Sequence, residues 1–303
     1  MRTKNVILIA GAFIFLLSCS RKFYRAKATH QIPSVNNNVC KRLVGKVVLY
    51  AIFVDSRYTH PWTAYDISST LDSIKKAMAW VTVKGKENNI DFSIEIKYYQ
   101  NKDTIPIVQN LFENTLYSTL FAPGLIDGID NLDFWANNIA KKAGLSFPPD
   151  TSRVVKTKNE ITDRERLIAR LRNIYSTDNV VLMYFLNSYH QDDISLALFT
   201  SSREKTEFSI VTFKKPAVIS HEFLHIFGAF DLYISPFDRK KRALKSKLQI
   251  MKLYPNEIMA FTDRQIEKLD ISPLTKYLIG WTPDLNDKDK ELLFGKNIKV
   301  YKY

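Results

Sequence analysis

The chain has 303 residues, of which 46% are hydrophobic and 25% charged, a composition typical of a globular protein large enough for an extensive core. With nine glycines, eleven prolines and no internal repeat, collagen-like and solenoid architectures are excluded. The formal net charge of +13 would by itself be compatible with a nucleic-acid partner.

The N-terminus has the features of an export signal. Two cations precede an apolar run, VILIAGAFIFLL (6–17), which is shorter than the roughly 20 residues that a membrane-spanning helix needs. The run ends in LLSC (16–19), which resembles the lipobox of bacterial lipoproteins. That resemblance implies removal of a signal peptide (1–18), acylation of Cys19, and a lipid anchor in the cell envelope, at the outer membrane or cell surface. An uncleaved anchor and an ordinary secretory signal are the alternatives.

The mature protein would remain basic. Loss of the signal peptide removes Arg2 and Lys4 and leaves a net charge of +11. An exported, membrane-tethered chain rarely meets nucleic acid, so we expect no such partner. Anionic lipid headgroups or acidic substrates suit the charge better, although solvated lysines are the simplest explanation. We expect a monomer.

The chain has two cysteines, and only one would be lipidated. If Cys19 is acylated, Cys40 has no disulfide partner within the chain, so the core must hold the domain together. A Cys19–Cys40 disulfide and a zinc-bound Cys40 thiolate are the two alternatives.

The domain is expected at 46–303, after a polar and basic tether at 19–45. KVVLYAIFV (46–54) is β-branched and aromatic enough for a buried strand, and 67–89 shows the apolar spacing of a helix. At 91–99 apolar and polar residues alternate, as in a half-buried strand. The sequence therefore predicts a β-α-β unit at the start of the domain.

Residues 100–178 predict a helical insertion, with an apolar stretch at 111–125 and helices at 132–145 and 162–175. Three candidate strands follow, separated by short polar turns: NVVLMYFL (179–186), DISLALFT (193–200) and EFSIVTF (207–213). Together with the β-α-β opening, they predict a single α/β (α+β) domain built on a mixed sheet.

One predicted helix carries the most distinctive residues of the sequence. We expect this helix to start at Pro216, because proline is favoured at the first position of a helix, where its missing N–H costs nothing. His221 and His225 are four residues apart, so both project from one face of the helix and can reach one metal ion. Glu222 lies beside them, where a carboxylate can take a proton from a metal-activated water molecule and pass it to the leaving amine.

The residues after this helix extend the pattern. Gly228 stands where the helix must end in a left-handed residue, which lets the chain double back. Asp231 would then supply a third ligand and leave the fourth position of a zinc ion open, as in catalytic zinc sites. Glu257 or Glu267 is the alternative third ligand, as in peptidases that use a glutamate on a later helix, but that scheme leaves Gly228 and Asp231 without a role.

HEFLHIFGAFD (221–231) fits the pattern HExxHxxGxxD and resembles the metzincin clan of metallopeptidases, in particular the snapalysin-type members with aspartate as third ligand. The resemblance implies one catalytic Zn²⁺ and a twisted mixed sheet whose antiparallel edge strand, here within 193–200, binds extended substrate. It also implies a methionine in a tight turn beneath the metal, for which Met259 is the candidate and Met251 the reserve. Phe261 stands where some members have a tyrosine, so the oxyanion-stabilising group stays unassigned.

A small C-terminal subdomain is expected at 232–303. Within it, DRKKRALKSK (238–247) is predicted to be a solvated loop, with a basic rim beside the cleft as the functional alternative. ISPLTKYLIGW (271–281) is predicted to be a packing helix, followed by a charged tail.

The function expected from these features is that of a membrane-anchored zinc endopeptidase acting on protein or peptide substrates. One alternative is a catalytically silent surface-binding lipoprotein with the same fold, and another is a metallohydrolase of non-peptide amides. Glu222 argues against the silent protein, because a metal-binding scaffold has no need of a general base.

Overall fold

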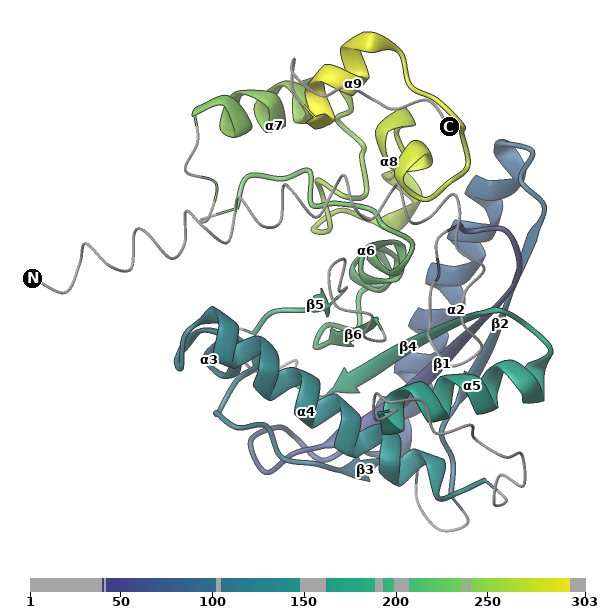
Figure 1. Ribbon diagram of the computed structural model, residues 1–303, viewed down its shortest axis with the longest axis vertical. Helices are drawn as coiled ribbons and strands as arrows, with labels where there is room; N and C mark the ends of the chain where they lie inside the picture. The colour runs from purple at the N-terminus through teal and green to yellow at the C-terminus, as the bar shows by residue number, and fades with distance from the viewer. Residues whose placement is uncertain are drawn as a thin grey trace, which may run out of the picture.

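The computed structural model describes residues 40, 42–101, 105–147, 162–188, 193–198, 207–235, 238 and 241–294. A six-stranded mixed sheet lies between helices on both of its faces (Figure 1). The strands are β1 (Gly45–Asp55), β2 (Phe92–Tyr98), β3 (Ile107–Val108), β4 (Asn179–Leu186), β5 (Leu196–Leu198) and β6 (Phe208–Val211). The helices are α2 (Ala64–Glu87), α3 (Leu116–Phe121), α4 (Leu125–Gly144), α5 (Asp163–Tyr175), α6 (Pro216–Ile226), α7 (Lys241–Leu253), the 3₁₀ turn η1 (Ile266–Lys268), α8 (Pro273–Leu278) and α9 (Asp287–Phe294).

The sheet has the strand order β2-β1-β4-β6-β5, with β3 paired to the end of β1. The pairings β1–β2, β1–β4 and β4–β6 are parallel, whereas β5 runs antiparallel to β6 at the edge of the sheet. This arrangement confirms the predicted α/β class and mixed sheet. It also places the core of the candidate strand 193–200 at an edge of the sheet.

Side chains of β1 alternate between two cores. One set shares a core with residues of α2 and α6, and consists of Val47, Leu49, Ala51 and Phe53. The other set shares a core with residues of α4 and α5, and consists of Val48, Tyr50, Ile52 and Val54. Burial on both faces explains why this strand has a nearly continuous apolar sequence.

Helix α2 supports the start of α6. Thr63 and Asp66 form a capping box at the N-terminus of α2, each side chain accepting a hydrogen bond from the backbone N–H of the other. Asp66 also pairs with Lys214, just before α6, at 2.8 Å between Oδ1 and Nζ. Further along, the Ser220 hydroxyl donates to the Ala77 carbonyl at 3.3 Å. These contacts fix α6, the helix of the His221 motif, against α2.

Helices α3, α4 and α5 form the opposite layer. Helix α4 begins at Leu125, well before the predicted start at residue 132. The early part contains Gly128, and glycine is a poor helix former. Here the glycine has a packing role, because a Cβ atom at this position would lie 1.9 Å from the Leu120 carbonyl oxygen of α3. The close approach of α3 therefore explains why a glycine occurs within this helix.

The C-terminal region differs from two of the predictions. The segment 238–247, predicted to be a loop, is mostly the beginning of α7. Its lysines, its alanine and its leucine are strong helix formers, and the charge of the segment obscured that propensity. The predicted helix at 271–281 shortens to α8, and the predicted charged tail contains α9. Trp281 ties this region to the start of β1, since its Nε1–H donates to the Leu43 carbonyl at 2.8 Å.

Two sequence predictions concern the N-terminal part of the chain. The signal peptide (1–18), Cys19 and the tether up to residue 39 lie outside the described residues. Among the helices that the structure describes, none combines the length and hydrophobicity needed to cross a membrane. Cys40 is fully buried, with its Sγ atom 3.5 Å from the Val180 carbonyl oxygen.

Candidate metal centre and active site

Helix α6 begins and ends where the sequence predicts. Pro216 occupies its first turn, and Gly228 adopts a φ of 95°, a left-handed conformation that suits glycine. The backbone N–H of Ala229 then bonds back to the Leu224 carbonyl at 3.2 Å. This reversal closes the helix and directs the following loop, with Asp231, toward the histidines.

Three side-chain atoms converge beside α6. His221 Nε2 lies 3.0 Å from His225 Nε2 and 3.0 Å from Asp231 Oδ1, and His225 Nε2 lies 3.2 Å from the same oxygen. Ligand atoms 2.0–2.2 Å from a tetrahedral zinc ion lie roughly 3.3 Å from one another. The three atoms therefore have close to the spacing that one ion requires, and the group is the one among the described residues that could hold a metal.

Backbone carbonyls fix the orientation of both imidazoles. His221 Nδ1 lies 3.1 Å from the Ile258 carbonyl oxygen, and His225 Nδ1 lies 2.9 Å from that of Ala229. A carbonyl can only accept, so we assign the ring proton of each neutral histidine to Nδ1. Both Nε2 atoms are then lone-pair acceptors aimed at the shared centre, as in metal sites whose histidines are oriented by outer hydrogen bonds.

The chemistry of this donor set fits a cation. Two imidazole lone pairs and a carboxylate oxygen repel one another at 3 Å unless a positive charge lies between them. Burial alone would lower the pKa of His225, but the Asp231 carboxylate raises it to about 9, so without an ion a proton on His225 relieves this repulsion, and a bound ion would take the place of that proton. Burial alone would raise the pKa of Asp231, but the two imidazoles hold it below its usual range. Nitrogen and carboxylate ligands suit zinc, and three of them leave a fourth position for water or substrate.

Glu222 is the buried acid of the site. Its side chain is on the same helix and only 4% of its surface is exposed. Burial raises the pKa of Glu222, against the opposing effect of the two neighbouring histidines. Its Oε2 atom accepts no hydrogen bond from any described residue. A buried carboxyl oxygen without such a partner is costly, so it is well suited to act on a bound molecule.

A tight turn at 257–260 contacts His221 through the Ile258 carbonyl. The backbone N–H of Ala260 bonds to the Glu257 carbonyl at 3.0 Å, and the fully buried Met259 lies inside that turn. The Met259 carbonyl accepts from the backbone N–H of Leu232 at 2.9 Å, directly after Asp231. Met251, the reserve candidate, lies on α7 instead of in a turn.

The two glutamates of the alternative ligand scheme lie elsewhere. Glu257 is buried, and its carboxylate accepts hydrogen bonds from Met259, Ser272 and Thr275. Glu267 is exposed and pairs with Lys76 on α2 at 2.6 Å. Neither belongs to the group of donor atoms that could hold a metal.

Tyr233 is a site residue that the sequence analysis missed. Its ring centroid lies 6.2 Å from that of His221, and the side chain is partly exposed. Burial, reinforced by the charges of Asp231 and Glu222, raises the pKa of Tyr233, so the phenol remains protonated at neutral pH. The sequence analysis sought a tyrosine at position 261, after the methionine. The sequence feature that could have indicated Tyr233 is its position two residues after Asp231, the candidate third ligand.

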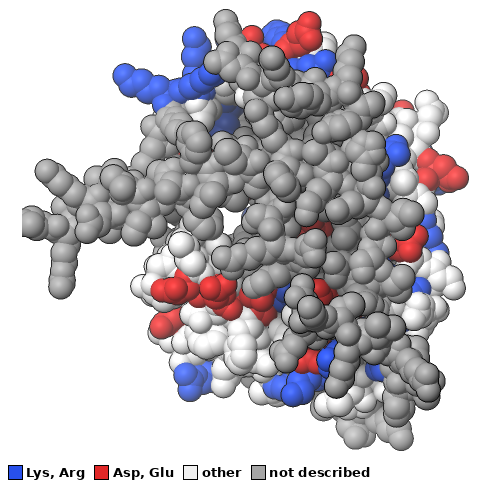
Figure 2. All heavy atoms as spheres, in the orientation of Figure 1, with Lys and Arg blue, Asp and Glu red and all other residues white. Residues whose placement is uncertain are grey.

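The surroundings of the site carry charges of both signs. Exposed acidic residues occur near α3 and at the start of α4, namely Glu113, Asp127 and Asp130, and no lysine or arginine occurs between Lys102 and Lys141. Figure 2 shows acidic side chains gathered over α3 and α4, and basic side chains at α7. Helix α3 is tied to the segment leading into β5, because Asp193 accepts from the backbone N–H groups of Leu116 and Tyr117, each at 3.0 Å.

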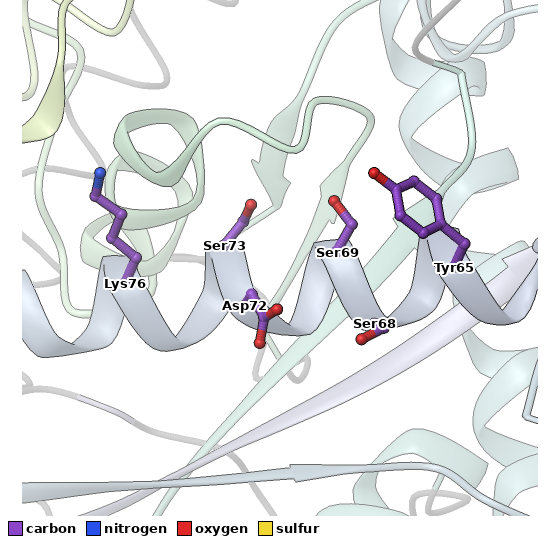
Figure 3. Close-up of a pocket in the computed structure, with 6 residues that line it drawn as sticks. All are labelled: Tyr65, Ser68, Ser69, Asp72, Ser73 and Lys76. Carbon is purple, nitrogen blue, oxygen red and sulfur yellow. The ribbon is translucent and has the colours of Figure 1, made fainter.

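A separate hollow of about 390 Å³ runs along α2 (Figure 3). It is lined by Tyr65, Ser68, Ser69, Asp72, Ser73 and Lys76. None of these residues belongs to the cluster beside α6, so this hollow is distinct from the candidate site.

The structure thus brings His221, His225 and Asp231 together, with Glu222 beside them and Met259 in the turn that contacts His221. Cys19 lies outside the described residues. Comparison of the chain with protein-family models, curated proteins and solved structures finds no significant match. The interpretation of the site therefore depends on its own geometry and chemistry.

Proposed function

We propose that the protein is a zinc-dependent endopeptidase, anchored to the cell envelope through an acylated Cys19. One observation carries the enzymatic part of the proposal. Three metal-ligand atoms, from His221, His225 and Asp231, converge next to a buried Glu222 carboxyl that has an oxygen without a protein partner among the described residues. A site that only stored a metal ion would gain nothing from that oxygen.

His221, His225 and Asp231 would hold the ion through two nitrogens and one oxygen. Zinc bound there would supply a Lewis acid that lowers the pKa of a water molecule and polarises the scissile carbonyl. The Glu222 carboxylate, next to these ligands, would serve as the general base that accepts a proton and later passes it to the leaving amine. Burial raises the pKa of Glu222, which suits a group that must both accept and donate a proton.

Tyr233 is the candidate for stabilising negative charge on the carbonyl oxygen. Its phenol stays protonated and lies beside the histidine–aspartate group. A protonated hydroxyl can donate a hydrogen bond to an oxygen as negative charge develops on it. Tyr233 would thus fill the role for which some metzincins use a tyrosine at the position of Phe261. The Phe261 ring lies against Arg264, with the guanidinium carbon 3.9 Å from the ring centroid.

The edge strand favours an extended peptide as substrate. β5 pairs with β6 on one side only among the described strands, and its three residues are partly exposed. The unpaired backbone groups of such an edge can bind an extended chain as an added strand. A metallohydrolase of small non-peptide amides would have no need of this edge, so the peptidase is the better of the two enzymatic hypotheses.

The proposal is tested by exposing the chain from Ser20 onward to a mixed peptide library, with and without a zinc chelator. The Glu222→Ala variant is the matched control. We expect cleavage that the chelator abolishes and that zinc restores, and no cleavage by the variant. Absence of cleavage by a wild-type chain that binds zinc would favour the silent binding protein or a non-peptide substrate.

A further inference from the structure

The buried Glu257 carboxylate holds together the turn that contacts His221. Its Oε1 atom accepts from the Met259 backbone N–H at 2.9 Å and from the Thr275 hydroxyl at 3.0 Å. Its Oε2 atom accepts from the Ser272 backbone N–H at 2.6 Å. Only 1% of the residue is exposed, and no described lysine or arginine forms an ion pair with it. Neutral donors alone therefore satisfy a fully buried carboxyl group.

Two carbonyl groups of the same turn accept hydrogen bonds that help to position two of the proposed metal ligands, His221 and Asp231. The carbonyl of Ile258, between Glu257 and Met259, accepts from His221 Nδ1 at 3.1 Å. The Met259 carbonyl accepts from the Leu232 N–H at 2.9 Å, one residue after Asp231. The direction of these two carbonyls thus sets the rotation of one imidazole and the position of the aspartate loop.

We infer that Glu257 is a positioning residue for the metal centre, acting through the Ile258 and Met259 carbonyls on His221 and Asp231. The inference rests on the proposed function, because it takes these two residues as metal ligands. Without the carboxylate, the N–H groups of Met259 and Ser272 lose their acceptor inside the protein. The turn must then rotate to find new partners, and the Ile258 carbonyl turns away from His221.

A purely structural role is the competing explanation. Glu257 also joins the turn to the start of α8, through Ser272 and Thr275, so its loss would destabilise the C-terminal region in either case. The two explanations differ in metal affinity. Outer groups that orient a ligand typically change metal affinity by about 10- to 100-fold when they are removed, whereas a distant stabilising contact leaves it unchanged.

The experiment compares Glu257→Gln with wild type in the chain from Ser20 onward, which contains every described residue. Zinc affinity is measured by competition with a chromophoric chelator, the geometry of the site by the visible spectrum of the Co²⁺-loaded protein, and folding by thermal melting. Asp289→Asn is the matched control. Asp289 is another buried carboxylate of the C-terminal region, which accepts from the Tyr254 hydroxyl at 2.8 Å and has no contact with the turn carbonyls.

We expect Glu257→Gln to weaken zinc binding about 10-fold or more and to alter the Co²⁺ spectrum, and Asp289→Asn to lower only the melting temperature. Thr275→Val keeps the carboxylate and removes one donor, so it should weaken zinc binding less, which preserves the test if Glu257→Gln fails to fold. Wild-type zinc affinity and Co²⁺ spectrum in both Glu257→Gln and Thr275→Val would overturn the inference. Zinc binding without peptide cleavage by the wild type would instead refute the peptidase and leave this result intact.

Discussion

Glu222 occupies a position that favours function over stability. Its carboxyl group is 4% exposed, and one of its oxygens has no partner among the described residues. Burying such a group reduces the stability of the fold, and burying a neutral amide would reduce it less. We therefore expect Glu222→Gln to lower kcat by at least about 10²-fold while the metal-free protein melts at the same or a higher temperature. Peptide cleavage and calorimetry measure the two effects. A variant that melts well below wild type would show that the glutamate is a structural group.

Tyr233 gives a second prediction at the residue scale. Tyr233→Phe keeps the ring against His221 and removes the hydroxyl that would donate to the carbonyl oxygen. Loss of one such donor typically lowers kcat by about 10²- to 10³-fold. Steady-state kinetics test this, with Tyr254→Phe as control because that hydroxyl bonds to Asp289. Equal effects of the two substitutions would contradict the role.

The residues of the site differ in how far the sequence could predict them. His221, His225 and Asp231 lie within eleven consecutive residues, so local helix geometry and one left-handed glycine suffice to bring them together. Tyr233 is as close in sequence but fits no periodic pattern. Glu257 was weighed as a ligand because sequence cannot tell a carboxylate that binds metal from one that binds backbone N–H groups. Its partners Ser272 and Thr275 are distant in the chain.

At the scale of elements, the bounds of a strand or helix could be predicted where burial alone determines which residues it contains. β4 spans Asn179–Leu186 as predicted, because a strand buried on both faces is a run of apolar residues with clear ends. The start of α4 and the helix α7 were missed, because their propensities conflict with another signal: Gly128 in α4 and a high positive charge in α7. Gly128 is required by the tertiary contact with α3, and such a contact cannot be predicted from the local sequence pattern.

The link between α2 and α6 gives a pH-dependent prediction. The hydrogen bond from Lys214, together with that from Thr63, holds the pKa of Asp66 well below its usual range. A carboxyl whose pKa is lower in the folded state stabilises the fold above its unfolded pKa of about 3.9, and the stabilisation is lost as pH falls. Asp66→Asn should therefore reduce the free energy of unfolding by about 1–2 kcal/mol at pH 7, and by less at pH 3.

Urea denaturation of the two proteins at pH 7 and pH 3 measures this difference. Asp72→Asn is the control, since Asp72 lies on the same helix but is exposed and pairs with Lys75 in a surface contact. A difference for Asp66→Asn that is the same at both pH values would contradict the assigned role of the Lys214 pair.

At the scale of the whole molecule, the proposed membrane attachment would depend on one residue, Cys19. Cys19 follows an apolar run that is too short to span a bilayer, so we expect acylation to be the anchor. In a bacterial host, Cys19→Ala should move the protein from the membrane fraction to the soluble fraction or leave it as an uncleaved precursor. Fractionation and mass spectrometry of the N-terminus distinguish these results. A variant that is cleaved and membrane-bound as efficiently as wild type would refute the lipid anchor.

The proposed function requires that His221, His225 and Asp231 bind one zinc ion together. The most direct test is the metal content of the purified chain from Ser20 onward, measured by elemental analysis after dialysis against a weak chelator, for wild type and the variants His221→Ala, His225→Ala and Asp231→Ala. We predict one zinc ion per chain in wild type and a loss of retained zinc in each variant. Retention of zinc by all three variants, or its absence from the wild type, would contradict the claim.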